Sequence, residues 1–124
     1  MEELKNYSDL QSHFDNVAFV LKTQQQIAKD FAKFNLFFPE KFEETPFSKI
    51  EIEQQIANLL AEIMREGETR LLQLLYTIDL SEKEFLHLTT HPDFLAELSR
   101  KILFREAYKV FLRSKFSSAG NSIE

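Results

Sequence analysis

The chain contains no cysteine, only two glycines and only three prolines among its 124 residues. The absence of cysteine excludes disulfide bonds, thiolate zinc sites and cysteine nucleophiles, and it is compatible with a reducing compartment. The scarcity of glycine and proline argues against a β-sandwich or β-barrel, because those folds need a turn about every ten residues. Long helices joined by short connections need fewer turn residues, so the composition favours an all-α fold.

Two kinds of apolar segment are missing as well. No stretch approaches the roughly 18 uncharged apolar residues that a membrane-spanning helix requires, so we expect no membrane span. The N-terminal sequence MEELKNYSDLQSH has no basic region followed by an apolar run, so we expect no secretory signal. Together with the absence of cysteine, these features predict a cytoplasmic protein.

Apolar residues make up 44% of the chain, which is enough for one folded domain with a core of its own. They recur every three or four positions in five segments, and this spacing is typical of amphipathic helices. The five segments are residues 9–34, 49–66, 69–78, 81–88 and 93–116. We therefore predict a compact all-α bundle of about five helices over residues 1–116, followed by a polar, disordered tail over residues 117–124.

Short polar signals mark where three of these helices begin. Ser8 precedes the first helix and is expected to cap it. Ser48 with Glu51, and Ser81 with Glu84, each form the pattern of a capping box, in which a serine and a glutamate satisfy each other's backbone N–H groups. These signals predict helix starts at residues 9, 49 and 82.

Other residues are singled out by their places in the predicted helices. Gly67 is expected to end the second helix. Gln24 falls on the apolar stripe of the first helix, where it is either a residue at the solvent edge or a contact that sets the register. Tyr76 and Tyr108 are expected to pack in the core with their hydroxyls at a polar edge.

The connection over residues 35–47, with the sequence NLFFPEKFEETPF, is rich in phenylalanine. Loops are usually polar, so this loop either packs back onto the domain or presents its rings to another surface. The chain has thirteen phenylalanines in all, and such a surplus of aromatic side chains is typical of a protein with an interface. We take four of them as a candidate interface: Phe37, Phe38, Phe42 and Phe47.

Charge is distributed unevenly along the chain, whose net charge is −5. Residues 100–124 carry six basic and two acidic side chains, whereas residues 1–99 carry nine basic and eighteen acidic ones. Four basic residues step by four along the last helix and form a winding ridge, a candidate contact for an acidic partner. They are Lys101, Arg105, Lys109 and Arg113.

Three roles are open for this ridge. It could pack against acidic helices of its own domain, with the long lysine and arginine stems covering apolar surface. It could contact an acidic protein, or it could lie across nucleic-acid phosphates. Nucleic acid is the least favoured of the three, because the rest of the acidic chain would repel a polyanion.

No catalytic, cofactor-binding or metal-binding constellation is present. Two isolated glycines cannot form a phosphate-binding loop, and no serine-nucleophile motif occurs. His87 and His91 have the spacing of metal ligands on a helix, but Pro92 disfavours helical geometry at His91, and His13 is the one other histidine. We therefore expect no catalytic residues, no cofactor and no metal, and we predict that the protein is not an enzyme.

A resemblance to known proteins is carried by two stretches in the C-terminal half. They are RLLQLLYTIDLSEKEF at residues 70–85 and LSRKILFREAYKVFLRSKFS at residues 98–117. Together they resemble a group of small, uncharacterised helical proteins of bacteria. The resemblance implies a helical fold and a bacterial cytoplasm, and it implies no activity. It singles out Tyr76, Asp79, Arg105 and Glu106. We expect Asp79 to help cap the short helix, and Arg105 and Glu106 to pair with charges on neighbouring helices.

These observations predict a protein–protein interaction or assembly module, with either another protein or a second copy of the chain as its partner. The prediction depends on the surplus of aromatic residues and on the absence of a competing catalytic constellation. The alternative is a nucleic-acid-associated regulator that uses the basic C-terminal helix.

Overall fold

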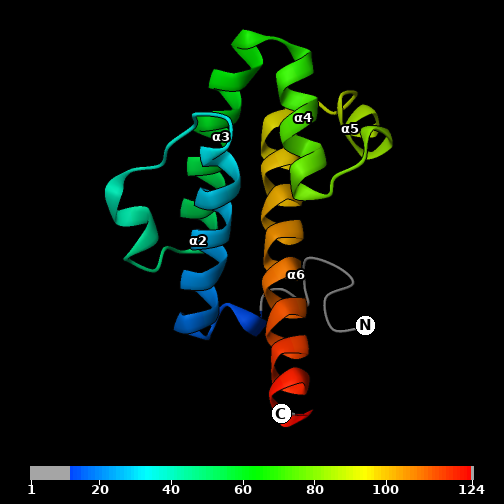
Figure 1. Cartoon of the computed structure of the whole chain (residues 1–124). Coiled ribbons are helices and arrows are strands. Elements are labelled where there is room, and N and C mark those ends of the chain that lie inside the picture. Colours follow the sequence, from blue (N-terminus) through cyan, green and yellow to red (C-terminus); the bar gives the residue numbers. More distant parts are fainter. Residues whose placement is uncertain (1–11, 124) are drawn as a thin grey trace.

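The computed structural model describes the backbone of residues 12–123 and the side chains of residues 12–114. Five α-helices and one short 3-10 helix lie wholly within this part, and it contains no strand, so the all-α prediction is confirmed (Figure 1). The elements are α2 (Val17–Ala32), η1 (Glu40–Glu43), α3 (Lys49–Glu66), α4 (Glu68–Ile78), α5 (Glu82–Leu88) and α6 (Phe94–Ile123). None of the described helices is long and apolar enough to cross a membrane.

The two predicted capping boxes are both formed. The Ser48 hydroxyl accepts a hydrogen bond of 3.1 Å from the Glu51 backbone N–H, and the Glu51 carboxylate accepts one of 2.8 Å from the Ser48 N–H. Ser81 and Glu84 make the same exchange at the start of α5, with distances of 3.1 and 3.3 Å. Because each capping side chain contributes about 0.5–2 kcal/mol, these local signals determine where α3 and α5 begin.

Residues with positive φ angles end α3 and α4. Gly67 lies between α3 and α4 with φ at 122°, a conformation that side chains with a Cβ rarely adopt, and its position confirms the predicted end of α3. Asp79 ends α4 in the left-handed conformation, with φ at 75°. This residue therefore terminates α4, and Ser81 is the side chain that caps α5.

The first predicted helix is interrupted. The structure begins α2 at Val17, because the Asn16 side chain accepts a hydrogen bond of 3.1 Å from the Phe19 N–H and so caps a new helix. An asparagine that bonds the backbone in this way competes with a helix running through it. The expected cap, Ser8, lies outside the described residues.

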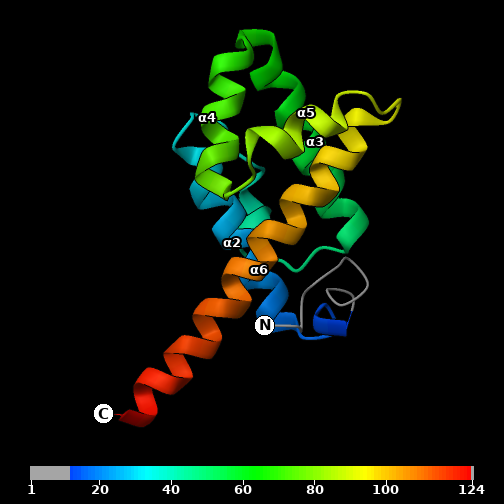
Figure 2. The ribbon, with the colours of Figure 1, turned by 90° about the vertical axis from the view of Figure 1, so that its right-hand side faces the viewer.

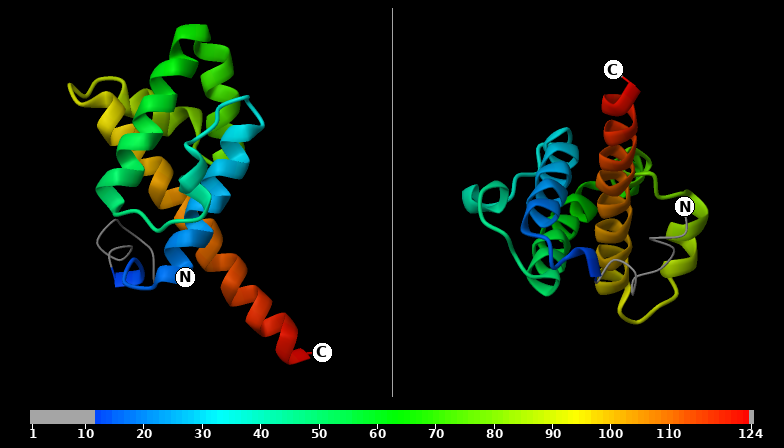
Figure 3. Two further views of the ribbon diagram at one scale, coloured as in Figure 1. Left: turned by 90° about the vertical axis from the view of Figure 1, so that its left-hand side faces the viewer. Right: turned by 90° about the horizontal axis from the view of Figure 1, so that it is seen from below.

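Helix α6 packs against every other α-helix of the described part. In Figure 3 it runs between α2 and α3 on one side and α5 on the other. The core that these helices enclose is aliphatic with a few aromatic rings, and many of its side chains are completely buried: Ile27, Phe31, Ile52, Ile56, Leu60, Ile63, Leu74, Leu75, Ile78, Leu98, Ile102 and Leu103.

The backbone of α6 continues as a helix to Ile123, through most of the segment that we expected to be a disordered tail. Its last turns extend beyond the other helices, as Figure 2 shows. Residues 117–123 contain no proline, and extending a helix that already exists needs no new nucleation, even though Gly120 disfavours helix by about 1 kcal/mol. Glu124 lies outside the described residues.

Gln24 holds the phenylalanine-rich loop against α2. Its side chain is completely buried, and its amide nitrogen donates hydrogen bonds to the carbonyls of Phe42 (2.6 Å) and Thr45 (2.8 Å). Its amide oxygen accepts a third hydrogen bond, of 2.7 Å, from the Phe47 N–H. Of the two roles that were open for Gln24, the position at the solvent edge is wrong, and the buried amide anchors the loop backbone.

Three of the four loop phenylalanines pack against the domain. Phe42 is completely buried, Phe38 stacks on it with ring centroids 4.1 Å apart, and Phe47 meets it edge-on at 5.4 Å. The prediction that Phe42 forms part of an interface is therefore wrong. Phe37 differs from the others because 66% of it is exposed.

Candidate functional site

Three ionisable side chains meet inside the interface between α2 and α6. The Lys109 ammonium lies 2.8 Å from a carboxylate oxygen of Asp30 and 3.3 Å from one of Glu106. It also donates a hydrogen bond of 3.1 Å to the carbonyl of Thr77 in α4. Asp30 and Glu106 are both buried. We call Asp30, Glu106 and Lys109 the buried charge cluster.

The protonation states of this cluster follow from burial and from the neighbouring charges. Burial, reinforced by the charge of Asp30, raises the pKa of Glu106 to about 9, so this carboxyl is neutral at pH 7. Burial also works to raise the pKa of Asp30, but the hydrogen bonds of Lys109, Glu106 and Gln26, together with the charge of Lys109, outweigh it and hold that pKa below its ordinary value. The cluster therefore contains one cation, one anion and one neutral carboxyl, which is a combination that a core tolerates.

The basic ridge predicted on α6 is divided between different partners. Lys109 is engaged in the buried charge cluster, and Lys101 pairs with Glu84 of α5 at 3.7 Å. The Arg105 guanidinium lies over the Tyr108 ring, 5.9 Å from its centroid. Packing against acidic neighbours of the same domain, one of the three roles that were open for the ridge, is thus confirmed for Lys101 and Lys109. Arg113 is exposed.

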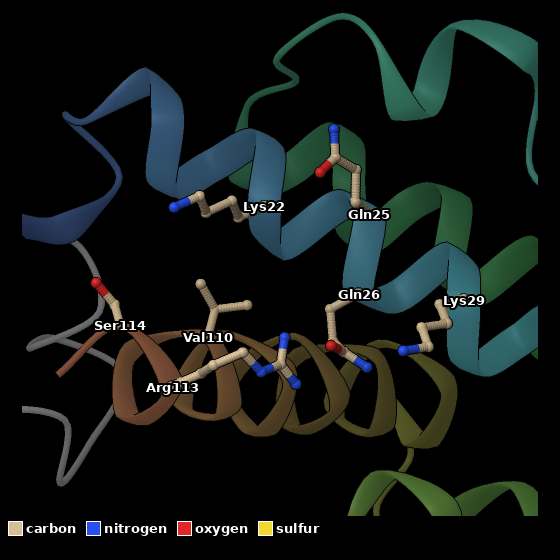
Figure 4. A pocket seen from close by; sticks show the side chains of 7 residues that line it. All are labelled: Lys22, Gln25, Gln26, Lys29, Val110, Arg113 and Ser114. Carbon is tan, nitrogen blue, oxygen red and sulfur yellow. The ribbon is translucent and has the colours of Figure 1, made fainter. Parts of the chain in front are cut away.

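Arg113 lines a groove of about 380 Å³ between α2 and α6. In Figure 4 it extends from α6 into the space between the two helices, and Lys29 and Gln26 of α2 point into the same space. The remaining lining residues are Lys22, Gln25, Val110 and Ser114. We call this site the basic groove. The two lysines were not singled out from the sequence, because nothing local shows that α2 lies beside α6.

A second groove, of about 420 Å³, lies at the other end of α6, where the α3–α4 turn meets α5. Its lining is mostly apolar and consists of Met64, Glu68, Leu71, Phe85, Leu86, Thr89 and Phe94. Leu71 and Phe85 are buried and form its floor, whereas 39% of Met64 and 52% of Leu86 is exposed. We call this site the apolar groove. Sequence periodicity assigns such residues to the core and does not reveal which of them stay uncovered.

The other candidate residues from the sequence do not assemble into a reactive site. The His87 and His91 rings lie 6.0 Å apart and are exposed, and no group of three or more potential metal ligands occurs among the described residues. Tyr76 is 55% exposed, and its hydroxyl lies 3.3 Å from the Glu82 carboxylate, so the prediction that Tyr76 packs in the core is wrong.

Comparison with protein-family models, with curated proteins and with solved structures finds no significant match to this chain. The two grooves and the chemistry of the side chains that line them are therefore the basis on which a function can be inferred.

Proposed function

We propose that the protein is a protein–protein interaction module and that its apolar groove receives apolar side chains from a helix of the partner. The observation that carries this proposal is the pair of exposed side chains, Met64 and Leu86, at the rims of a groove whose floor is the hydrophobic core. An exposed apolar concavity of this kind is typical of surfaces that bind an amphipathic helix.

The energetics support binding at this groove. Burying a leucine or methionine side chain completely is worth about 1.5–3 kcal/mol, and the exposed parts of Met64 and Leu86 are what a partner would cover. The groove is framed by the α3–α4 turn, α5 and the start of α6, so its shape exists before the partner arrives. A preformed surface loses less conformational entropy on binding than a loop does.

The lining side chains favour binding over chemistry. Glu68 supplies the one carboxylate among them and Thr89 the one hydroxyl. Acid–base or nucleophilic catalysis needs a positioned pair of groups with matched pKa values, so recognition of apolar side chains is the function that this lining supports best.

The first experiment asks whether the partner is a second copy of the chain. Molar mass in solution is measured by light scattering behind a sizing column, for the natural chain and for Leu86→Glu. Phe37→Glu is the matched control, because it also places a glutamate at an exposed apolar position and changes the net charge equally.

A dimer that persists at high salt and dissociates in Leu86→Glu but not in Phe37→Glu would identify the groove as the dimer interface. A dimer that dissociates in Phe37→Glu alone would move the interface to the phenylalanine-rich loop and contradict the proposal. A monomeric natural chain would exclude a second copy, and the partner would then be a different protein.

A further inference from the structure

Three cations, Lys22, Lys29 and Arg113, line the basic groove. Among the side chains that the structure describes, no carboxylate forms an ion pair with Lys22, Lys29 or Arg113. No acidic residue is present among the lining residues either. Three like charges in one groove create a positive potential that attracts an anion.

The same helices show how a paired cation is arranged in this protein. Lys109, on the same helix as Arg113, is held by Asp30 at 2.8 Å, and Lys33, one helical turn after Lys29, lies 3.5 Å from Asp30. Asp30 is thus the shared partner of Lys109 and Lys33, and among the described side chains it forms no ion pair with the groove cations. The positive charge of the groove therefore belongs to its surface and is not part of the buried charge cluster.

The polar lining suits a carboxylate ligand. Gln26 is mostly buried, and in Figure 4 its amide lies between the Lys29 side chain and the Arg113 guanidinium. An arginine guanidinium donates to carboxylate oxygens in fixed directions, whereas a lysine ammonium acts as an adaptable point charge. The Gln26 amide bonds the Asp30 carboxylate and so forms a fixed wall of the groove. Val110, also in the lining, offers apolar contact to the stem of an acidic side chain.

We propose that the basic groove is a second interaction surface, separate from the apolar groove, and that it binds an acidic polypeptide segment. The two grooves share no lining residue, so an experiment can contradict the proposal for one groove without affecting the proposal for the other. Charge complementarity with the three cations of the groove selects the ligand.

One observation favours an acidic polypeptide over nucleic acid. The chain as a whole carries a net charge of −5, which repels a long polyanion, whereas a short acidic segment experiences mainly the local field of the groove.

The test measures binding of a fluorescein-labelled oligoglutamate peptide by fluorescence anisotropy at low and high salt. The groove variant is Lys22→Gln/Lys29→Gln/Arg113→Gln. The matched control is Lys41→Gln/Arg65→Gln/Lys83→Gln, which removes three exposed cations from η1, α3 and α5 and changes the net charge equally. A labelled single-stranded DNA of the same net charge serves as the competing ligand.

The proposal predicts that the groove variant binds the peptide about tenfold more weakly than the natural chain, since each exposed contact contributes up to about 1 kcal/mol. The control variant should lose less than about twofold. Equal losses in both variants, or no binding by the natural chain at low salt, would overturn the proposal. Tighter binding of DNA that the groove variant abolishes would assign the groove to nucleic acid instead.

Discussion

The apolar groove and the basic groove lie on one bundle, but different kinds of side chain support them. Under the apolar groove, Leu71 and Phe85 belong to the hydrophobic core. Beside the basic groove, the lining residue Gln26 lies next to Asp30, which is a member of the buried charge cluster. In both places the inner residues pack against other residues of the fold, whereas the rims keep apolar surface or charge exposed.

This difference separates residues that stabilise the protein from residues that are available to bind. Inner substitutions should lower the free energy of unfolding, through lost packing at the apolar groove and through lost electrostatic pairing beside the basic groove. Rim substitutions should leave the free energy of unfolding nearly unchanged.

The largest expected effect is at the centre of the buried charge cluster. Lys109→Ala removes the closer of the two cations beside the buried Asp30 carboxylate and leaves only the largely exposed Lys33, 3.5 Å away, so we expect the free energy of unfolding to fall by up to about 3–5 kcal/mol. The measurement is urea unfolding at pH 7, followed by circular dichroism. Lys101→Ala removes an exposed pair with Glu84 and should cost no more than about 1 kcal/mol. Equal losses in the two variants would contradict the distinction between the inner cluster and the exposed ridge.

Truncation of the floor of the apolar groove should lower the free energy of unfolding somewhat less, and this loss should not depend on pH. Leu71→Ala removes a buried apolar side chain, and we expect a loss of about 2–5 kcal/mol. Because no ionisable group is involved, the loss should be the same at pH 6 and pH 8. Urea unfolding at both pH values checks this expectation. A loss that changes with pH would show that the floor of the apolar groove and the buried charge cluster are not independent.

Glu106 should make the stability of the natural chain depend on pH. Its pKa is about 9 in the folded protein, against an ordinary value of 4.5, so folding takes up a proton between those values. The stability that neutral Glu106 allows is complete below pH 4.5 and is lost as the pH rises to about 9, with a slope of up to about 1.4 kcal/mol per pH unit.

Glu106→Gln keeps the size of the side chain and removes this proton, so the variant should have a flatter stability curve between pH 5 and 9. Asp30 and Lys109 do not produce the same slope. The lowered pKa of Asp30 makes stability fall only as the pH drops below its ordinary 3.8, and the raised pKa of Lys109 makes it fall only above 10.5. Identical slopes in the variant and the natural chain would show that Glu106 is ionised in the folded protein.

The smallest expected effects on stability are at the rims. Arg113→Gln and Leu86→Gln change exposed side chains, so each should shift the free energy of unfolding by less than about 0.5 kcal/mol. Urea unfolding of both variants checks this expectation. A loss of several kcal/mol in either variant would show that its side chain supports the fold and is not reserved for a partner.

The elements that the sequence predicted well depend on contacts between near neighbours. Both capping boxes join residues three positions apart, and Gly67 acts through its own backbone conformation. The interruption at Asn16 was missed because an asparagine side chain can either face solvent or cap a helix, and the apolar spacing continues across it.

The features that the sequence did not reveal depend on distant parts of the chain. Asp30 and Lys109 are 79 residues apart, and Gln24 anchors a loop about twenty residues further on. Lys109 pairs with Asp30, whereas Arg113 forms no ion pair with any side chain that the structure describes. Nothing in the local pattern tells the two apart, since both belong to one basic ridge. The same holds for Phe42 and Phe37, which differ in burial and not in local sequence character.

The most direct test of the proposed interaction is site-specific photo-cross-linking in cells of the native host. The photoreactive amino acid p-benzoylphenylalanine is placed at position 86 in the apolar groove or, as the control, at position 83, where Lys83 is exposed on the same helix outside the groove lining. We predict one dominant protein adduct from position 86 that is absent from position 83, identified by mass spectrometry. The same adducts from both positions, or none from position 86, would contradict a protein-binding role for the apolar groove.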